Sequence, residues 1–291
     1  MKYAEIVKNI KAGNFAPIYF LMGEETYHID QLTKLIENVA LPEDQQSFNQ
    51  TVLYGRDTDV NTIIGEAKRY PMMADRVVVI VREAQDIRMI ENLEKYVENV
   101  QPTTVLVIAY KYKTIDKRKK FYKLLSNGNV VFESKKLYDN QIPDWIGNNL
   151  AQRGYGSSMK ARMLLAQSLG SDLGRIDSEL AKLELVAEKG ATIDEQIVED
   201  NIGISKDYNN FELITALGHK DLLKALTIQK YFAANPKDNP LVVTIGLLFG
   251  FFSKLMIVHQ AQDKTPGSLA KLIGVNPFFI KDYQTGAVNY D

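Results

Sequence analysis

Residues 15–30 read FAPIYFLMGEETYHID, and this stretch decides how the first part of the chain folds. After Pro17, residues 18–22 form an unbroken apolar run that ends at Gly23, and a helical pattern begins at Thr26. Continuous apolar runs are typical of strands buried on both faces of a parallel sheet, where a helix carries the chain to the next strand. The stretch therefore predicts a strand, a tight turn and a helix, the opening unit of an α/β domain.

The same alternation continues to about residue 135. Further strands are predicted at residues 51–54, 77–81, 105–109 and 130–132, because each run is short and rich in β-branched residues. Helices are predicted at residues 26–40, from Val60 to Ala67, and at residues 87–100 and 116–126. Five strands with intervening helices imply a five-stranded parallel sheet between two helical layers.

Beyond residue 136 the apolar spacing is helical only, so the rest of the chain is predicted to be all-α. A polar segment at residues 203–210 has the composition of a hinge. We therefore predict an α/β domain at residues 1–136, a small helical lid domain at 137–206 and a helical domain at 207–291.

Composition excludes several classes of site. The chain has 291 residues, no cysteine and a formal net charge of −1. Disulfides, thiolate zinc sites and cysteine nucleophiles are therefore absent, and no global field draws the protein to nucleic acid. The three histidines lack ligand spacing, so we expect no metal and no cofactor. The polar start of the chain predicts a cytoplasmic protein.

A parallel-sheet domain followed by a helical lid is the layout of AAA+ ATPases. In that fold the turn after the first strand holds phosphates with backbone amides and a lysine, and a Ser or Thr holds Mg²⁺. Here the turn contains Gly23, Glu24 and Glu25, and no Gly-Lys-Ser/Thr occurs in the chain. Two carboxylates stand where phosphate oxygens would lie, which disfavours phosphate binding.

The ends of two other strands also lack the expected chemistry. The third strand ends in Arg82 and Glu83, so an arginine holds the position of the Mg²⁺-binding aspartate, and the fourth ends at Tyr110 without a γ-phosphate sensor. These losses predict a degenerate nucleotide site and no intrinsic catalysis. Two alternatives stay open: a fold unrelated to these ATPases, and a nucleotide-binding α/β enzyme with an unorthodox phosphate site.

Four blocks of sequence, in order along the chain, resemble the delta subunit of the bacterial DNA polymerase III clamp loader, a degenerate AAA+ family. They are FAPIYFLMGEE at residues 15–25, GSDLGRIDSELAKL at 170–183, NFELITALG at 210–218 and DYQ at 282–284. The resemblance implies a subunit that binds no ATP and opens the ring-shaped sliding clamp for loading on primed DNA during replication. It implies as partners the beta clamp, the gamma/tau and delta-prime subunits and primed DNA, within a DNA-directed DNA polymerase complex.

The resemblance also points to a clamp-binding segment. The family inserts a hydrophobic plug, which lies between a helix and the third strand, into the clamp. Residues 68–76 align with it, reading KRYPMMADR, and they place Tyr70, Pro71, Met72 and Met73 at the plug. Methionine departs from the family's usual leucine or phenylalanine, but an unbranched polarizable side chain also fits an apolar pocket. From the residues alone, a loop that packs into its own core is an equal alternative.

A basic cluster with interleaved aromatic residues lies at residues 110–123. Its centre, Lys117, Arg118, Lys119 and Lys120, is a candidate contact for DNA phosphates. The alternative is a solvated helix face, which the pattern favours.

Residues 241–258 are almost wholly apolar. A membrane span, and with it a membrane-tethered scaffold, is one interpretation of such a run. The resemblance instead implies a collar domain that joins loader subunits, with this helix buried on all sides. Family members usually continue beyond the position of Asp291, so we expect a collar that is truncated at its C-terminus.

Overall fold

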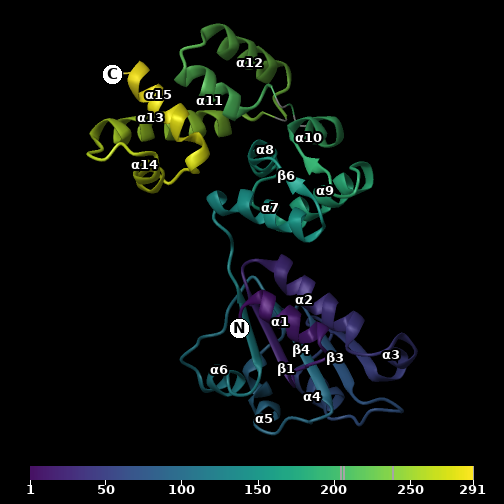
Figure 1. The fold of residues 1–291 in the computed structure, drawn as a ribbon. Helices are drawn as coiled ribbons and strands as arrows, with labels where there is room; N and C mark the ends of the chain where they lie inside the picture. Colours follow the sequence, from purple (N-terminus) through teal and green to yellow (C-terminus); the bar gives the residue numbers. More distant parts are fainter. Residues whose placement is uncertain (204, 206, 238, 291) are drawn as a thin grey trace. The chain divides into compact units, whose positions relative to one another are not determined.

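The computed structural model describes residues 1–203, 205, 207–237 and 239–290. The chain separates into two compact units, Met1–Lys136 and Leu137–Asp291 (Figure 1). The predicted division of the helical part at residue 206 stays a prediction, and the predicted hinge at residues 203–210 lies partly outside the described residues.

The N-terminal unit is built on a parallel sheet of five strands, in the order β2-β3-β4-β1-β5. This confirms the predicted fold class. Each strand coincides with one of the apolar runs, because a run buried on both faces can form only a central or covered strand. The strands are β1 (Ile18–Gly23), β2 (Gln50–Tyr54), β3 (Val77–Arg82), β4 (Thr104–Lys111) and β5 (Val130–Ser134).

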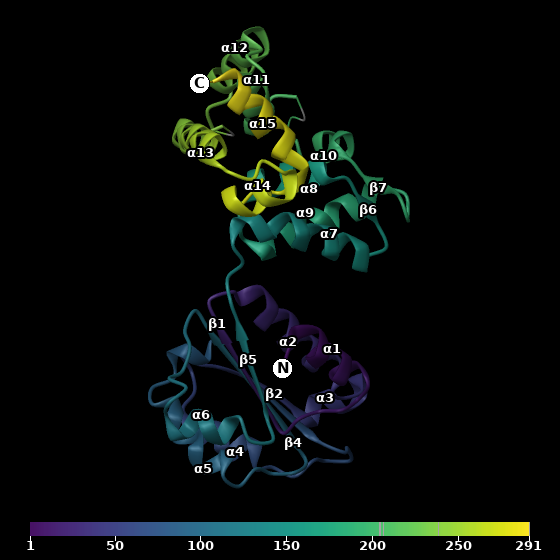
Figure 2. The ribbon, with the colours of Figure 1, turned by 60° about the vertical axis from the view of Figure 1, so that its left-hand side comes forward.

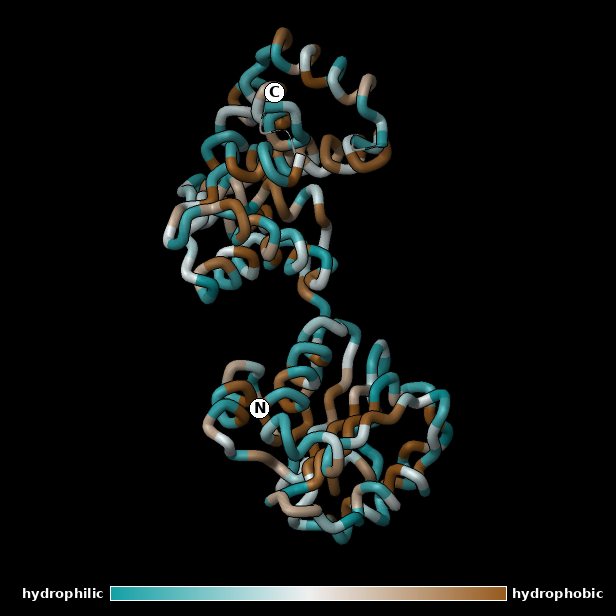
Figure 3. Tube along the Cα trace, turned by 90° about the vertical axis from the view of Figure 1, so that its right-hand side faces the viewer, coloured by the Kyte–Doolittle hydropathy of each residue, from teal (hydrophilic) through white to brown (hydrophobic). Residues whose placement is uncertain are grey.

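Helices cover both faces of the sheet and bury two apolar clusters. Helices α4, α5 and α6 lie on one face and α1 and α2 on the other (Figures 1 and 2). Neighbouring side chains of β1 enter different clusters: Phe20 packs with α4, α5 and α6, whereas Leu21 packs with α1 and α2. Figure 3 shows the apolar strands at the centre of this unit. The helices are α1 (Tyr3–Lys11), α2 (Thr26–Val39), α3 (Glu43–Asn49), α4 (Val60–Ala67), α5 (Glu94–Val97) and α6 (Lys120–Leu125).

Three local predictions for this unit were wrong. In place of the predicted helix at residues 87–100 there are two short pieces, η2 (Ile90–Leu93) and α5, and η1 (Ala84–Asp86) precedes that range. Met89 has a left-handed backbone (φ 53°), which interrupts a right-handed helix. Helix α6 is shorter than expected, and α3 was not predicted at all.

The second unit begins with η3 (Asp139–Gln141) and four helices. The Ser158 side chain accepts a hydrogen bond from the Ala161 amide (3.0 Å), which caps α8. The all-α expectation needs a correction, because β6 (Gly156–Ser157) and β7 (Thr192–Ile193) form a short parallel pair. The helices are α7 (Ile142–Gln152), α8 (Met159–Leu169), α9 (Leu173–Val186) and α10 (Glu195–Ile202).

The last part of the chain is helical, as predicted (Figure 2). Phe251 and Leu255 of the long helix α13 pack around Gly286 of α15, where a Cβ atom would lie 3.1 Å from both side chains. The elements are α11 (Asn210–Gly218), α12 (Leu222–Ala234), α13 (Leu241–Gln260), α14 (Pro266–Ile273), η4 (Pro277–Phe279) and α15 (Ile280–Asn289).

Candidate functional site

Residues 68–76 form the loop between α4 and β3, and its apolar residues 70–73, here called the tip, lie outside the core. Tyr70 is 78% exposed, Met72 58% and Met73 99%, while Pro71 is half-buried. The alternative of a loop packed into its own core is therefore wrong for these side chains. Exposed apolar groups that gather in one segment mark a surface for another molecule.

The loop is held at both ends. Where it leaves the core, the buried Ala67 carbonyl accepts hydrogen bonds from Thr104 Oγ1 (2.8 Å) and the Tyr96 hydroxyl (3.3 Å). Where it returns, Ala74 packs on the core and the Arg76 guanidinium lies 4.6 Å from the centre of the Phe15 ring. These contacts fix the ends, so any freedom is confined to the residues between them.

The middle of the loop is held by one side chain that sequence reasoning missed. Asn49, the last residue of α3, accepts a hydrogen bond from the Met72 amide (2.7 Å) and donates one to the Met72 carbonyl (2.9 Å). Both backbone polar groups of Met72 are thus satisfied by a single amide. Nothing in the sequence pointed to Asn49, because α3 was not predicted and Met72 is 23 residues away.

Met73 follows with a left-handed backbone, φ 53°. Residues other than glycine adopt this region at a conformational cost, and surrounding structure has to maintain it. Its own side chain makes almost no packing contribution, since it is nearly fully exposed. The tip therefore presents a flexible, polarizable side chain from a backbone that its neighbours restrain.

The opposite end of the sheet carries the predicted degenerate nucleotide site, Gly23 to Glu25, Arg82 and Glu83. Together with Lys111, these residues are here called the carboxyl edge. The buried Glu25 carboxylate caps α2 and accepts a hydrogen bond from the Tyr27 amide (3.0 Å). It thus occupies the helix N-terminus, where phosphate-binding folds place an anion. Glu24 lies exposed.

Backbone amides of this turn also have partners within the chain. The Gly23 amide donates to the Lys113 carbonyl (3.0 Å), and the Glu25 amide to the Ser134 carbonyl (3.3 Å). A Cβ atom on Gly23 would lie 2.0 Å from the Ser134 oxygen, so only glycine permits this close approach of β1 and β5. A phosphate would have to displace these hydrogen bonds as well as the Glu25 carboxylate.

The charged residues at this edge form ion pairs. Arg82 contacts Glu37 of α2 (2.5 Å), and Lys111 contacts Asp30 (2.7 Å) and Glu83 (2.8 Å). Partial burial opposes ionisation of Glu83, but the hydrogen bond from Lys111 prevails and its pKa is lowered. Burial likewise opposes the charge on Lys111, but its two carboxylate partners raise its pKa. Arg82 and Glu83 therefore have different partners and do not act as one site.

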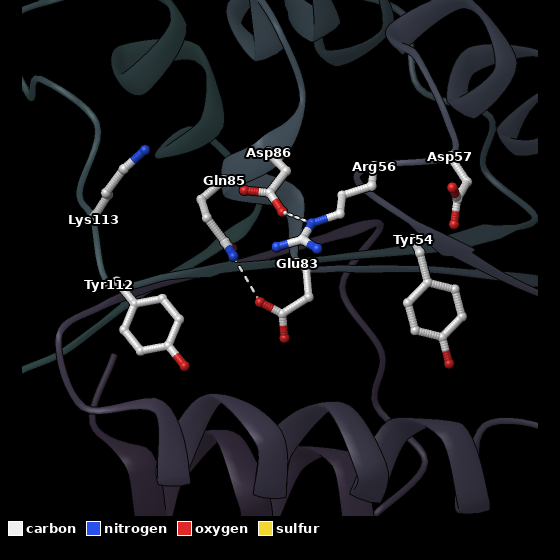
Figure 4. A pocket seen from close by; sticks show the side chains of 8 residues that line it. All are labelled: Tyr54, Arg56, Asp57, Glu83, Gln85, Asp86, Tyr112 and Lys113. Atoms are coloured by element: carbon white, nitrogen blue, oxygen red, sulfur yellow. Dashed lines mark hydrogen bonds and ion pairs between the residues drawn. The ribbon is translucent and has the colours of Figure 1, made fainter.

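A hollow of about 680 Å³ lies beside this edge (Figure 4). Glu83 is its only lining residue from the predicted nucleotide site, and Gly23, Glu24, Glu25 and Arg82 do not line it. Arg56 points toward Asp86 and pairs with it at 3.0 Å (Figure 4). The other lining residues are Tyr54, Asp57, Gln85, Tyr112 and Lys113. Acidic and basic side chains are mixed in this lining, so it offers no cluster of cations to phosphates.

The basic cluster is neutralised by its surroundings. Each of the four candidate DNA-contacting cations forms an ion pair with at least one carboxylate, and Lys120 contacts two. Glu94 and Glu98 raise the pKa of Lys120. The pairs are Lys117 with Glu133 (2.5 Å), Arg118 with Asp116 (2.9 Å), Lys119 with Glu91 (2.9 Å), and Lys120 with Glu94 and with Glu98 (2.7 Å). This arrangement favours the solvated helix face over a dedicated phosphate contact.

Helix α13 has one buried and one exposed face. Phe251, Leu255 and Val258 are buried, whereas Phe249 and Met256 are exposed. The expectation of burial on all sides is therefore wrong for the chain by itself. The helix is long and apolar enough to cross a membrane, but Lys254 lies within it, which disfavours a span.

Within the described parts of the chain, no group of three or more His, Asp or Glu side chains is arranged to hold a metal ion. The three histidines lie apart: His28 packs between Tyr3 and Tyr27, whereas His219 and His259 contact Asp282 and Tyr290 in the second unit.

Comparison with known proteins gives consistent matches. A family model described as DNA polymerase III, delta subunit, matches residues 19–135. The chain is 24% identical to DNA polymerase III subunit delta of Bacillus subtilis, over 95% of this chain and 83% of that protein. The solved structure of the Bacillus subtilis DNA clamp loader delta protein is similar with a TM-score of 0.60 and 22% identity, and the match covers 100% of this chain and 88% of that one. The structural similarity shows that this chain has the fold of that delta protein.

Proposed function

We propose that this chain, which belongs to the family of DNA polymerase III delta subunits, binds the sliding clamp through the tip at residues 70–73. A delta subunit is a replication protein and a non-catalytic part of the polymerase III complex. The tip offers several exposed apolar side chains of one loop to a partner protein, and a clamp is the partner that the family implies.

One observation carries the proposal: Met73 is almost fully exposed, yet the residue before it is fixed by a buried amide. An exposed methionine in a freely moving loop would lose conformational entropy on binding. A methionine presented by a restrained backbone avoids much of that cost, and few apolar anchors usually supply most of the affinity of a protein interface.

The mechanical step follows from differential binding. If the pocket that receives Met72 and Met73 is better formed in an open clamp, occupation of the pocket shifts the ring toward opening. The rigid three-layer unit behind the tip acts as the lever, because the loop is joined at both ends to the core of the sheet.

We infer that the chain does not use ATP itself. Glu25 at the start of α2 and the ion pairs of Arg82 and Lys111 support this, because they fill the carboxyl edge with the protein's own charges. Titration with a fluorescent ATP analogue and Mg²⁺ is expected to give no saturable binding. Saturable binding that Arg82→Ala abolishes would favour the nucleotide-binding enzyme instead.

We further propose that the exposed face of α13 docks against other loader subunits, which the family implies are gamma/tau and delta-prime. Exposed apolar side chains on this helix, such as Phe249, have no cover within the described chain. Phe249→Asp should prevent co-elution with these subunits during size-exclusion chromatography and leave clamp binding intact. Normal co-elution would rule out this face as the interface.

We also propose, from what the family implies, that the chain is cytoplasmic and that primed DNA lies inside the assembled loader. The ion-paired basic cluster gives little support for a direct DNA contact at Lys117 to Lys120. We therefore assign the DNA contact to the complex as a whole. Charge reversal at Lys119 is expected to leave DNA-dependent loading unchanged, and a loss of loading would restore the cluster as a contact.

The direct test is a surface-binding titration with the clamp of the same organism. Met72→Ala combined with Met73→Ala is expected to weaken binding by about 2–4 kcal/mol, roughly 30- to 1000-fold, with folding intact. Met89→Ala is the matched control, because Met89 is also exposed (68%) and also left-handed (φ 53°) but lies outside the tip. Equal affinities of the double variant and the native chain would rule out the tip.

A further inference from the structure

We propose that Asn49 is a positioning residue for clamp binding: its buried side chain holds the Met72 backbone and thereby sets the conformation in which the tip meets the clamp. This inference rests on the proposed function of the tip and extends it to a residue that need not touch the clamp. Asn49 lies on α3, and a pair of hydrogen bonds links this short helix directly to the loop before β3.

The orientation of the Asn49 amide is fixed by its partners. Its Oδ1 accepts from the Met72 N–H (2.7 Å), and its Nδ2 donates to the carbonyls of Met72 (2.9 Å) and Gln45 (3.1 Å). If the amide were flipped, its Nδ2 donor would face the Met72 N–H donor. The hydrogen-bond network therefore specifies one orientation. Asn49 is only 2% exposed, so water competes little for these bonds.

The restraint on the tip comes from Asn49 rather than from the tip's own packing. Met73 is 99% exposed and carries a left-handed backbone, so its side chain does little to maintain that conformation. The neighbouring fixed points are Arg69, three residues before Met72, and Ala74, two residues after it. The Arg69 guanidinium donates to the Phe48 carbonyl (3.4 Å) and pairs with Glu66 (2.7 Å). Without the amide, the chain between these fixed points would have several backbone conformations available, and the strained one at Met73 would lose population.

The consequence is a binding surface that is ordered before the partner arrives. When the restraint is removed, binding has to order the backbone of one or two residues at the moment of contact. The expected loss is about tenfold or more in clamp affinity, which is smaller than the loss expected when both methionines are truncated.

The experiment measures clamp affinity by surface-binding titration for full-length Asn49→Ala, with Gln46→Ala as matched control. Gln46 lies on the same helix and its Nε2 donates to the Leu41 carbonyl (3.2 Å), so the control removes a side-chain-to-backbone bond of α3 that does not reach the tip. We expect about tenfold weaker binding for Asn49→Ala and native affinity for Gln46→Ala.

A second readout separates positioning from general loss of stability. Hydrogen exchange of the Met72 amide is expected to accelerate in Asn49→Ala, while the amides of β3 keep their native rates. If Asn49→Ala does not fold, Asn49→Asp decides the question, because it keeps the acceptor for the Met72 N–H but loses both donors. It should bind the clamp more weakly than the native chain.

Failure of the inference and failure of the proposed function have different signatures. If truncation of Met72 and Met73 abolishes clamp binding but Asn49→Ala binds like the native chain, only the positioning role is overturned. Equal losses for Asn49→Ala and Gln46→Ala would also overturn it, since the effect would then reflect α3 as a whole. If the truncated tip binds the clamp normally, both proposals fall together.

Discussion

Strand β3 (Val77–Arg82) joins two regions that differ in side-chain environment: apolar side chains are exposed at one end, and charged side chains are paired at the other. At its amino end the tip leaves Met72 and Met73 in solvent, and at its carboxyl end Arg82 and its neighbours form ion pairs with α2. The six residues of the strand set these regions about 20 Å apart. Both ends belong to one rigid sheet, so a load applied at the tip is transmitted to the whole unit.

This contrast is the reason why we propose the tip, and not the carboxyl edge, as the contact for a partner. In an ATP-using domain of this architecture, polar groups at the carboxyl edge remain available for phosphates and Mg²⁺. Here Glu25 caps the helix and Lys111 is shared by Asp30 and Glu83, so that edge is occupied by internal contacts. The exposed apolar tip is the region that we propose for a protein partner.

A charge at the tip should have the largest effect. Met73→Asp would bury an unpaired carboxylate in an apolar pocket of the clamp, and we expect a loss of at least about 3 kcal/mol, more than 100-fold in affinity. The free energy of unfolding should change by no more than about 0.5 kcal/mol, because the side chain is exposed. Clamp titration and urea unfolding measure the two quantities.

The same charge at Met89 serves as the control, since Met89→Asp should bind normally. If Met73→Asp binds the clamp as tightly as the native chain, the contrast between the two ends of β3 is lost. If it binds weakly only because it is unfolded, urea unfolding will reveal that.

At the carboxyl edge we expect an effect on stability and none on clamp binding. Glu25→Ala removes the cap of α2, which should lower the free energy of unfolding by about 1 kcal/mol. Glu24→Ala, at the exposed neighbouring position, should change it by less than about 0.5 kcal/mol. A clear loss of clamp affinity in Glu25→Ala would show that the edge takes part in binding.

The smallest effect concerns pH. Burial between Tyr3 and Tyr27 lowers the pKa of His28 below its usual value near 6.5. The unfolded chain therefore binds a proton more readily, so stability is fully present above about pH 6.5 and decreases as pH falls toward the lowered pKa. His28→Gln should flatten this slope in unfolding experiments on the N-terminal unit.

Clamp affinity of the folded native chain should not follow the same pH dependence, because His28 lies on α2 and not in the tip loop. An unchanged stability slope in His28→Gln would assign the pH dependence to other groups.

Much of the fold could be predicted from the sequence. All five strands lie within about two residues of the predicted runs, because a strand covered on both faces has to be apolar at its buried positions, as β3 is from Val77 to Val81. The prediction failed where tertiary contacts decide the backbone. The left-handed conformation of Met89 divides an otherwise helical pattern, and α3 is too short for its periodicity to be recognised.

The candidate site was only partly predictable. The resemblance located Met72 and Met73, but the residues alone left their exposure open. The support from Asn49 and the pairing of Arg82 with Glu37 join positions 23 and 45 residues apart in the sequence. These contacts form only when whole helices and strands pack together, and the spacing of residues within one segment carries no information about that packing.

The most direct test of the central claim compares the two regions in one sample without any substitution. Hydrogen–deuterium exchange of the native chain is measured with and without saturating clamp. We expect slower exchange at residues 68–76 and unchanged exchange at residues 23–27 and 82–86. Protection of the carboxyl edge with an unchanged tip would contradict it.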